Sequence, residues 1–150
     1  MGDNYIFISY TRVDYKRIRE FVLHIAKRYS IWFDQRKLTA GDRFDSVIEE
    51  SIRNACCCIF FLTMNYGDSE YCWKELKLAM ENKISIYPVV IDSQENIDLS
   101  MYGKNMMALI EARSAIAIDR DDLQRIAKRH GVKETDTTGG KLDCYSKRIK

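Results

Sequence analysis

The sequence predicts a single α/β domain in which an open parallel sheet carries helices on both of its faces. Five short apolar runs alternate along the chain with segments of helix length. This alternation is typical of parallel strands joined by helical crossovers, and right-handed crossovers can place helices on either face. The chain has 150 residues. That length suits one domain that buries about two-thirds of the surface its unfolded chain exposes.

Composition and charge are those of an ordinary globular domain. Hydrophobic residues make up 46% of the chain, and 24 lysines and arginines nearly balance 22 acidic residues. The charges are spread along the chain, which argues against a nucleic-acid partner. The longest apolar runs have the length of strands, and the first residues do not resemble a signal peptide. We therefore expect a cytoplasmic protein with no membrane partner.

Three of the five cysteines are consecutive, at Cys56, Cys57 and Cys58. Consecutive side chains of a strand point to opposite faces, so these thiols cannot converge on one metal ion. We predict that they are small buried residues and that the protein holds no metal.

The first strand and the first helix follow from the spacing of apolar residues. Residues 5–10 form an apolar run rich in aromatic and β-branched side chains, as in a buried strand. Thr11 or Asp14 can cap the helix that follows. The predicted core-facing side of this helix has apolar residues at intervals of three and four, namely Ile18, Phe21, Val22, Ile25, Ala26 and Tyr29.

A second short strand spans 30–33 and leads to Asp34. The polar loop 34–42 is longer than most strand-to-helix connections, and loops of this length are often functional. The predicted core side of the next helix consists of Phe44, Val47, Ile48, Ser51, Ile52 and Ala55. A continuous apolar run at 55–62 then predicts a central parallel strand.

The helix after the third strand carries an aromatic residue and a carboxylate on one face. Tyr71 and Glu75 are one helical turn apart, and the stripe beside them consists of Cys72, Leu76 and Ala79. Such a pair can hold a planar or cationic ligand against the ring while the acid acts on it. The alternative, common in amphipathic helices, is a core Tyr71 with a solvated Glu75.

The fourth and fifth strands complete the predicted sheet. Residues 84–91 form the fourth strand, but Pro88 cannot donate to a ladder, so we expect the strand to curl, bulge or leave the sheet there. Residues 115–118 fit a short fifth strand. The predicted sheet is flavodoxin-like, with the strand order 2-1-3-4-5.

A last helix and a tail follow the sheet. The helix spans 121–130 and stops at Gly131. The residues beyond it are mostly polar and show no periodicity. We therefore expect a domain at 1–131 and a flexible tail at 132–150.

Several candidate residues fall on one edge of this sheet. Ligands of open α/β sheets bind outside the carboxyl ends of the strands, near the point where the strand order reverses. Ser9 and Tyr10 end the first strand, and Asp34 ends the second. The helix that carries Tyr71 and Glu75 follows the third strand. We therefore expect these side chains to share one site.

Several familiar kinds of site have no support in the sequence. The chain has neither GxGxxG after the first strand nor a P-loop motif. Thr63 stands where a phosphoacceptor domain of this topology needs an acid. His24 and His130 lie on different helices, and Cys72 has no histidine near it in the sequence. Neither a histidine triad nor a cysteine nucleophile is expected.

Four motifs in register resemble a known family. They are Phe7-Ile8-Ser9-Tyr10, Trp32-Phe33-Asp34 with Leu38-x-x-Gly41, Ser69-x-Tyr71-Cys72-x-x-Glu75-Leu76, and Ile86-x-Pro88-Val89. In this order and spacing they resemble the TIR domain (Toll/interleukin-1 receptor type) over residues 5–118. The chain is most similar to the bacterial-type, NAD-hydrolysing members, because Glu75 is present and the loop lacks the proline before Gly41 that receptor loops have.

The resemblance implies an activity and a set of site residues. In enzymatic members, a glutamate at the position of Glu75 acts on the nicotinamide ribose of NAD. An aromatic residue one turn earlier lines the pocket, and here it is Tyr71, where the family usually has tryptophan. Ser9, Tyr10 and Asp34 would complete the substrate-binding walls. NAD would be the substrate, with no other cofactor and no metal, and the products would be nicotinamide and ADP-ribose or a cyclic ADP-ribose.

The resemblance also implies partners. Family members often become active when TIR domains stack. We therefore expect self-association through the loop residues Arg36, Lys37, Leu38 and Gly41, in antiviral defence, innate immunity or cell-death signalling. The alternative is a non-catalytic TIR scaffold that binds other TIR domains through the same loop and through the faces of its helices.

Overall fold

The computed structural model describes residues 4–34, 46–63, 65, 70–90 and 120–135. Strands and helices alternate through these residues as predicted. Their bounds are β1 (Ile6–Ser9), a short 3-10 helix η1 (Arg12–Asp14), α1 (Tyr15–Ala26), β2 (Ile31–Trp32), α3 (Ser46–Arg53), β3 (Cys57–Leu62), α4 (Glu70–Glu81), β4 (Ile86–Val90) and α6 (Arg120–His130).

The described strands form one parallel sheet in the order β2-β1-β3-β4. Ile8 of β1 lies opposite Ile59 of β3, which in turn lies opposite Tyr87 of β4. The predicted order is therefore confirmed for four strands. The predicted fifth strand, 115–118, lies outside the described residues.

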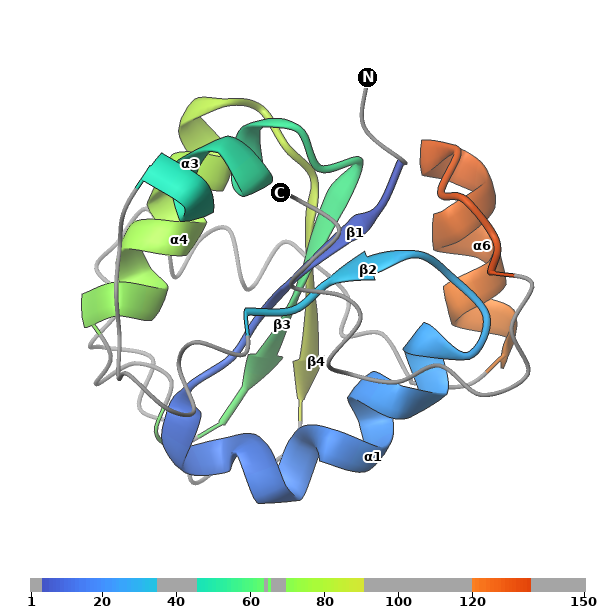
Figure 1. The fold of residues 1–150 in the computed structure, drawn as a ribbon, viewed down its shortest axis with the longest axis horizontal. Coiled ribbons are helices and arrows are strands. Elements are labelled where there is room, and N and C mark those ends of the chain that lie inside the picture. Colours follow the sequence, from blue (N-terminus) through green and yellow to red (C-terminus); the bar gives the residue numbers. More distant parts are fainter. Residues whose placement is uncertain (1–3, 35–45, 64, 66–69, 91–119, 136–150) are drawn as a thin grey trace.

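Helices cover both faces of the sheet, as Figure 1 shows. α3 and α4 pack on one face, and α1 and α6 pack on the other. Because successive side chains of a strand alternate between the faces, Ile6 and Ile8 of β1 face α1 and α6. Phe7 faces the opposite layer and stacks on Trp32 of β2, with ring centroids 5.2 Å apart.

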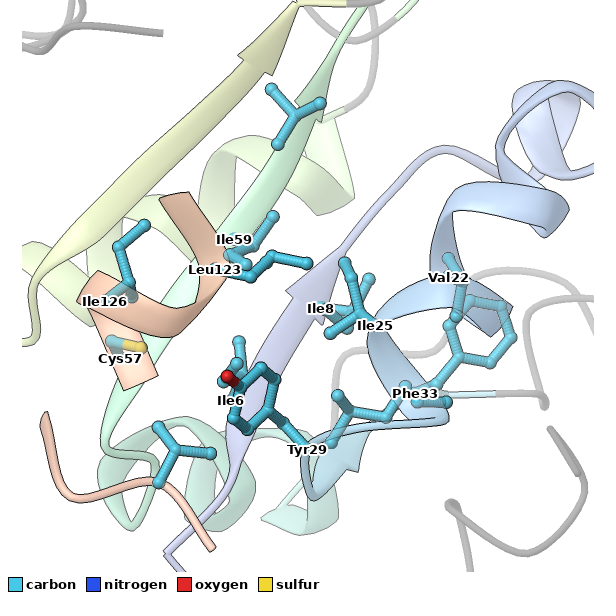
Figure 2. Packing of buried hydrophobic residues seen from close by; sticks show 14 of the residues in the cluster. Ile6, Ile8, Val22, Ile25, Tyr29, Phe33, Cys57, Ile59, Leu123 and Ile126 are labelled. Carbon is cyan, nitrogen blue, oxygen red and sulfur yellow. The ribbon is translucent and has the colours of Figure 1, made fainter. Parts of the chain in front are cut away.

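Figure 2 shows the core between the sheet and the helices α1 and α6. Ile25 of α1 lies near Ile8 of β1, and Leu123 of α6 lies near Ile59 of β3. Each of these side chains is at most 1% exposed, and burying one contributes roughly 1.5–3 kcal/mol. Cys57 is buried beside them, which raises the pKa of its thiol to about 12, so the thiol behaves as a small apolar group.

Two apolar residues predicted for the core lie at the surface instead. Val47 is 41% exposed and Phe21 is 36% exposed. The buried side of α3 includes Ile48 and Ile52, and Val47 lies one position from it, a rotation of about 100°. Phe21 lies at the border of the buried side of α1, where its ring centroid is 6.4 Å from that of Phe61.

β4 stays in the sheet through Pro88, so the predicted bulge or departure is wrong. Its register with β3 is unbroken, with Phe60 opposite Pro88. The amide of Cys58 donates to the carbonyl of Ser85. Every second residue from Ser85 onward therefore directs its backbone groups at β3. Pro88 lies between two of these residues, so its backbone groups face the other way. The N–H that it lacks would point away from β3, and the ladder is unaffected.

The start of α1 differs from the predicted capping. Asp14 occupies the N-cap position of α1 and Thr11 that of η1, but neither side chain makes a capping hydrogen bond. The Thr11 hydroxyl instead donates to the Asp14 carboxylate at 2.7 Å. Both residues flank the start of the helix as predicted, but their side chains bond to each other and do not cap it.

The end of α6 is joined to the beginning of the sheet. Gly131 follows the helix with a φ of +63°, a conformation that favours glycine. The amide of Lys133 donates to the carbonyl of Asn4, and its carbonyl accepts from the amide of Ser30, both at 2.8 Å. Residues 132–135 therefore pack beside the amino ends of β1 and β2. The domain boundary at 131 stays a prediction.

Candidate functional site

The carboxyl ends of β1 and β2 meet helix α4 at one edge of the sheet. Ser9 is the last residue of β1, and Asp34 lies two residues beyond the end of β2. The arrows of β3 and β4 in Figure 1 point to the same end, because all four strands are parallel. Since side chains alternate along β1, Ser9 faces the layer of α3 and α4, whereas Tyr10 faces α1.

Ser9 and Glu75 form a hydrogen-bonded pair at this edge. The Ser9 hydroxyl donates to Oε1 of Glu75 at 2.8 Å, and the two residues are 0% and 1% exposed. Glu75 therefore lies on the buried side of α4, and the alternative in which it is solvated is wrong. A buried carboxylate needs such donors, because an uncompensated buried charge is strongly unfavourable.

Asp34 joins two tyrosines at the same edge. Its backbone carbonyl accepts from the Tyr10 hydroxyl at 2.7 Å, and its Oδ2 accepts from the Tyr71 hydroxyl at 3.3 Å. The Tyr10 ring also stacks on Phe33, with centroids 4.5 Å apart. Asp34 is buried, so these contacts link β1, the residues after β2 and helix α4.

The Tyr10 hydroxyl remains a hydrogen-bond donor at physiological pH. Burial raises the pKa of Tyr10, and the carboxylates of Asp34 and Glu75 raise this pKa further. Both acids are therefore close enough to act on the same phenol. Two carboxylates at one buried edge create a negative potential, which favours a cationic ligand or a transition state that gains positive charge.

Cys72 packs against the site as an anchor. Its thiol donates to the backbone carbonyl of Tyr10 at 3.3 Å, and the residue is buried with Leu76 and Ala79 on the apolar stripe predicted for α4. A buried thiol bonded to a carbonyl is a poor nucleophile. The contact ties α4 to the end of β1.

The structure brings the five predicted active-site residues together through these contacts, namely Ser9, Tyr10, Asp34, Tyr71 and Glu75. The roles assigned to them by resemblance stay predictions. The predicted assembly residues, namely Arg36, Lys37, Leu38 and Gly41, lie outside the described residues.

A second polar cluster at this edge has no motif in the sequence. Thr63 and Asn65 follow β3, and their side chains donate to Asp14 at the start of α1. The sequence signal that could have identified this cluster is a polar residue directly after an apolar strand, because loops at strand ends often carry functional residues. Their convergence on Asp14 depends on the pairing of β1 with β3.

Two further features bear on the kind of site. In the described part of the chain, no three His, Cys, Asp or Glu side chains gather where they could hold a metal ion. The prediction of a metal-free protein stays a prediction. Among the described helices, none has the length and apolar character needed to cross a membrane.

Comparison of the sequence with known proteins finds relatives. A family model described as the TIR domain matches residues 6–127. A protein of Brachypodium distachyon, named probable 2′ cyclic ADP-D-ribose synthase BdTIR, is 31% identical over 90 residues, which are 58% of this chain. The matched part is 40% of that relative, so this chain spans less than half of its length.

Comparison of the structure finds a similar fold in the TIR domains of the activated Roq1 resistosome, described as directly recognizing the pathogen effector XopQ. The match covers 84% of this chain and 80% of that one, with 20% identity and a TM-score of 0.53. This likeness concerns the fold alone, and the assignment to a bacterial-type branch stays a prediction. Because the family model matches most of the chain, the protein belongs to the TIR domain family.

Proposed function

We propose that this TIR domain cleaves the bond between nicotinamide and ribose in NAD. The observation that carries the proposal is the buried pair of Ser9 and Glu75, which holds a carboxylate at the carboxyl edge of the sheet. A relative that matches part of the chain is named a probable 2′ cyclic ADP-D-ribose synthase, which supports the same substrate class.

The reaction requires few protein groups. When the glycosidic bond breaks, its electron pair moves to the pyridinium nitrogen, and nicotinamide leaves as a neutral molecule. No general acid has to protonate this leaving group, in contrast to ordinary glycoside hydrolysis. Positive charge develops on the ribose instead. A fixed carboxylate such as Glu75 stabilises that charge, and burial strengthens the interaction.

The other residues of the edge would bind and orient the substrate. Tyr71 lies one turn before Glu75, and its ring would stack on the nicotinamide. Asp34 adds a second negative charge that favours the cationic ring, and Tyr10 holds the Asp34 backbone in place. Ser9 would keep the Glu75 carboxylate in one orientation.

The fate of the ribosyl group decides the product. Attack by water at the ribosyl carbon, with loss of one proton, gives ADP-ribose. Attack by another nucleophilic group of the same molecule, again with loss of a proton, gives a cyclic ADP-ribose. We propose that one of these products serves defence or cell-death signalling, and that self-association through the loop 36–42 activates the enzyme.

A non-catalytic TIR scaffold is the second candidate, and the buried acid argues against it. A scaffold binds through its surface, whereas Glu75 is 1% exposed. Burial of a carboxylate costs several kcal/mol before its partners offset the loss. An arrangement of this kind is typical of a site that uses the charge.

The variant Glu75→Gln tests the proposal. Glutamine has nearly the same size and can still accept from Ser9, but it lacks the charge that the cationic transition state needs. We expect nicotinamide release from NAD to fall about 10²-fold or more, with the melting temperature nearly unchanged. Release should be measured at high protein concentration and with a crowding agent, because activity can depend on assembly.

Glu81→Gln is the matched control, since it makes the same chemical change on α4 at an exposed position. It should leave nicotinamide release unchanged. Equal release by wild type and Glu75→Gln would remove Glu75 from the catalytic role. A wild-type protein that releases no nicotinamide under any assembling condition would leave the scaffold as the better account.

A further inference from the structure

Asp14 is a buried carboxylate at the carboxyl edge of the sheet that has no part in the proposed chemistry. It is 1% exposed. Four side chains donate hydrogen bonds to it, namely Thr11, Arg17, Thr63 and Asn65.

Each carboxylate oxygen of Asp14 accepts two hydrogen bonds from side chains. Oδ2 accepts from the hydroxyls of Thr11 at 2.7 Å and Thr63 at 2.5 Å. Oδ1 accepts from the amide of Asn65 at 2.8 Å and from the Arg17 guanidinium at 3.4 Å. The Thr63 hydroxyl also accepts from the backbone N–H of Asn65 at 3.1 Å. Networks of buried polar groups that are satisfied in this way rigidify the segments that they join.

Three of the four donors lie next to the segments that carry the candidate active site. Thr11 directly follows Tyr10 and lies two residues after Ser9. Thr63 and Asn65 follow β3 and precede α4, the helix that carries Glu75. Asp14 therefore ties the end of β1 to the end of β3.

We propose that Asp14, with its donors Thr63 and Asn65, positions Glu75 against Ser9. A sideways shift of the segment after β3 relative to the end of β1 would move α4 and change the 2.8 Å distance between Ser9 Oγ and Glu75 Oε1. The catalytic part of this inference rests on the proposed function. The geometric part concerns one distance and stands without it.

The network should influence kcat more than KM. The Ser9–Glu75 pair acts on charge that develops only in the transition state, so its misplacement lowers kcat. Asp34 and Tyr10 lie outside α4 and are joined by a separate hydrogen bond, so this part of the surface that binds the substrate is less affected. A displacement of about 1 Å at a catalytic group can lower a rate about 10²-fold.

The test compares Thr63→Val with Thr63→Ser. Valine keeps the shape of threonine but has no hydroxyl, whereas serine keeps the hydroxyl. We expect kcat for nicotinamide release to fall about tenfold or more in Thr63→Val with KM within about threefold, and Thr63→Ser to restore most of kcat. Thr135→Val is the control, because the Thr135 hydroxyl donates to the Lys27 carbonyl just after α1, away from the site. It should leave kcat unchanged.

A double-mutant cycle separates positioning from general loosening of the fold. In a Ser9→Ala background, Thr63→Val should lower kcat much less than it does in the wild type, because the pair that it positions is already broken. Equal effects in both backgrounds would mean that Thr63 acts elsewhere. If Thr63→Val does not fold, Asn65→Ala takes its place in the same cycle, because it removes a single donor to Asp14.

Crystal structures of the wild type and of Thr63→Val provide a readout that does not depend on activity. We expect the Ser9 Oγ to Glu75 Oε1 distance to lengthen in Thr63→Val and to be kept in Thr63→Ser. An unchanged distance would overturn the positioning role even if the protein cleaves NAD. A changed distance in a protein that releases no nicotinamide would uphold the positioning and refute the proposed function.

Discussion

Tyr71 combines two properties that its neighbours in α4 do not share, a ring one turn from Glu75 and a hydroxyl that donates to Asp34 at 3.3 Å. The ring and the hydroxyl can be tested separately. Phenylalanine removes only the hydroxyl, whereas alanine removes both. A donor at this distance contributes about 1 kcal/mol or less to stability.

We expect Tyr71→Ala to raise KM for NAD more than it lowers kcat, because a ring that stacks on the substrate contributes mainly to binding. Tyr71→Phe should raise KM by a smaller factor and lower the free energy of unfolding by about 1 kcal/mol. Steady-state kinetics and urea unfolding of both variants measure these effects. Equal increases in KM would show that the hydroxyl, and not the ring, holds the substrate.

At the scale of elements, the contact between β4 and α6 includes a titratable histidine. The Tyr87 hydroxyl lies 2.6 Å from Nε2 of His130, and the two rings meet edge to face. Burial lowers the pKa of His130 from its ordinary value of 6.5, and the charge of Arg129 lowers this pKa further. The folded protein therefore favours the neutral imidazole.

This shift predicts that stability declines in mild acid. Because the pKa of His130 is lower in the folded state, the unfolded state binds the proton more tightly, and the free energy of unfolding falls as pH falls. The contribution is complete above the ordinary pKa of 6.5 and is lost as pH drops through the lower, folded-state value. Urea unfolding of the wild type and of His130→Asn measures this contribution at pH 7.5, 6.5 and 5.5, values that extend about one unit to each side of the ordinary pKa.

His130→Asn removes the titration and keeps a polar side chain at the end of α6. We expect its stability to vary less with pH than that of the wild type over this range. Parallel pH profiles for the two proteins would mean that other groups cause the decline.

At the scale of the whole molecule, self-association is the prediction that rests on sequence alone. Leu38 is an apolar residue between the basic pair Arg36 and Lys37 and the glycine of the same loop, and all of them lie outside the described residues. Leu38→Asp should weaken association and leave the monomer folded, because it places a charge where apolar contact is expected. Sedimentation velocity across a range of concentrations measures the effect.

Val47→Asp is a suitable control, since Val47 is an apolar residue that is 41% exposed on α3. It introduces the same charge outside the loop and should leave association unchanged. Identical sedimentation of the wild type and Leu38→Asp would exclude the loop as the contact.

The sequence by itself determined the features that depend on local periodicity. Apolar runs separated by helix-length segments sufficed for the strands and for the order of the four described ones. The helical period placed Tyr71 and Glu75 on one side of α4, and the continuous apolar run at 55–62 predicted a buried central strand that includes Cys57 and Ile59. These patterns involve neighbours in the chain, so they can be read without knowledge of the partner segments.

Tertiary structure alone decided the contacts between distant residues. Ser9 and Glu75 are 66 residues apart in sequence, and Thr63 and Asp14 are 49 apart. Their pairing depends on the register of β1 with β3 and on how α4 rotates against the sheet. Neither quantity is encoded in the spacing of apolar residues along one element. The exposure of Val47 depends on which side of α3 faces the sheet. The tolerance of Pro88 depends on which side of its backbone faces β3.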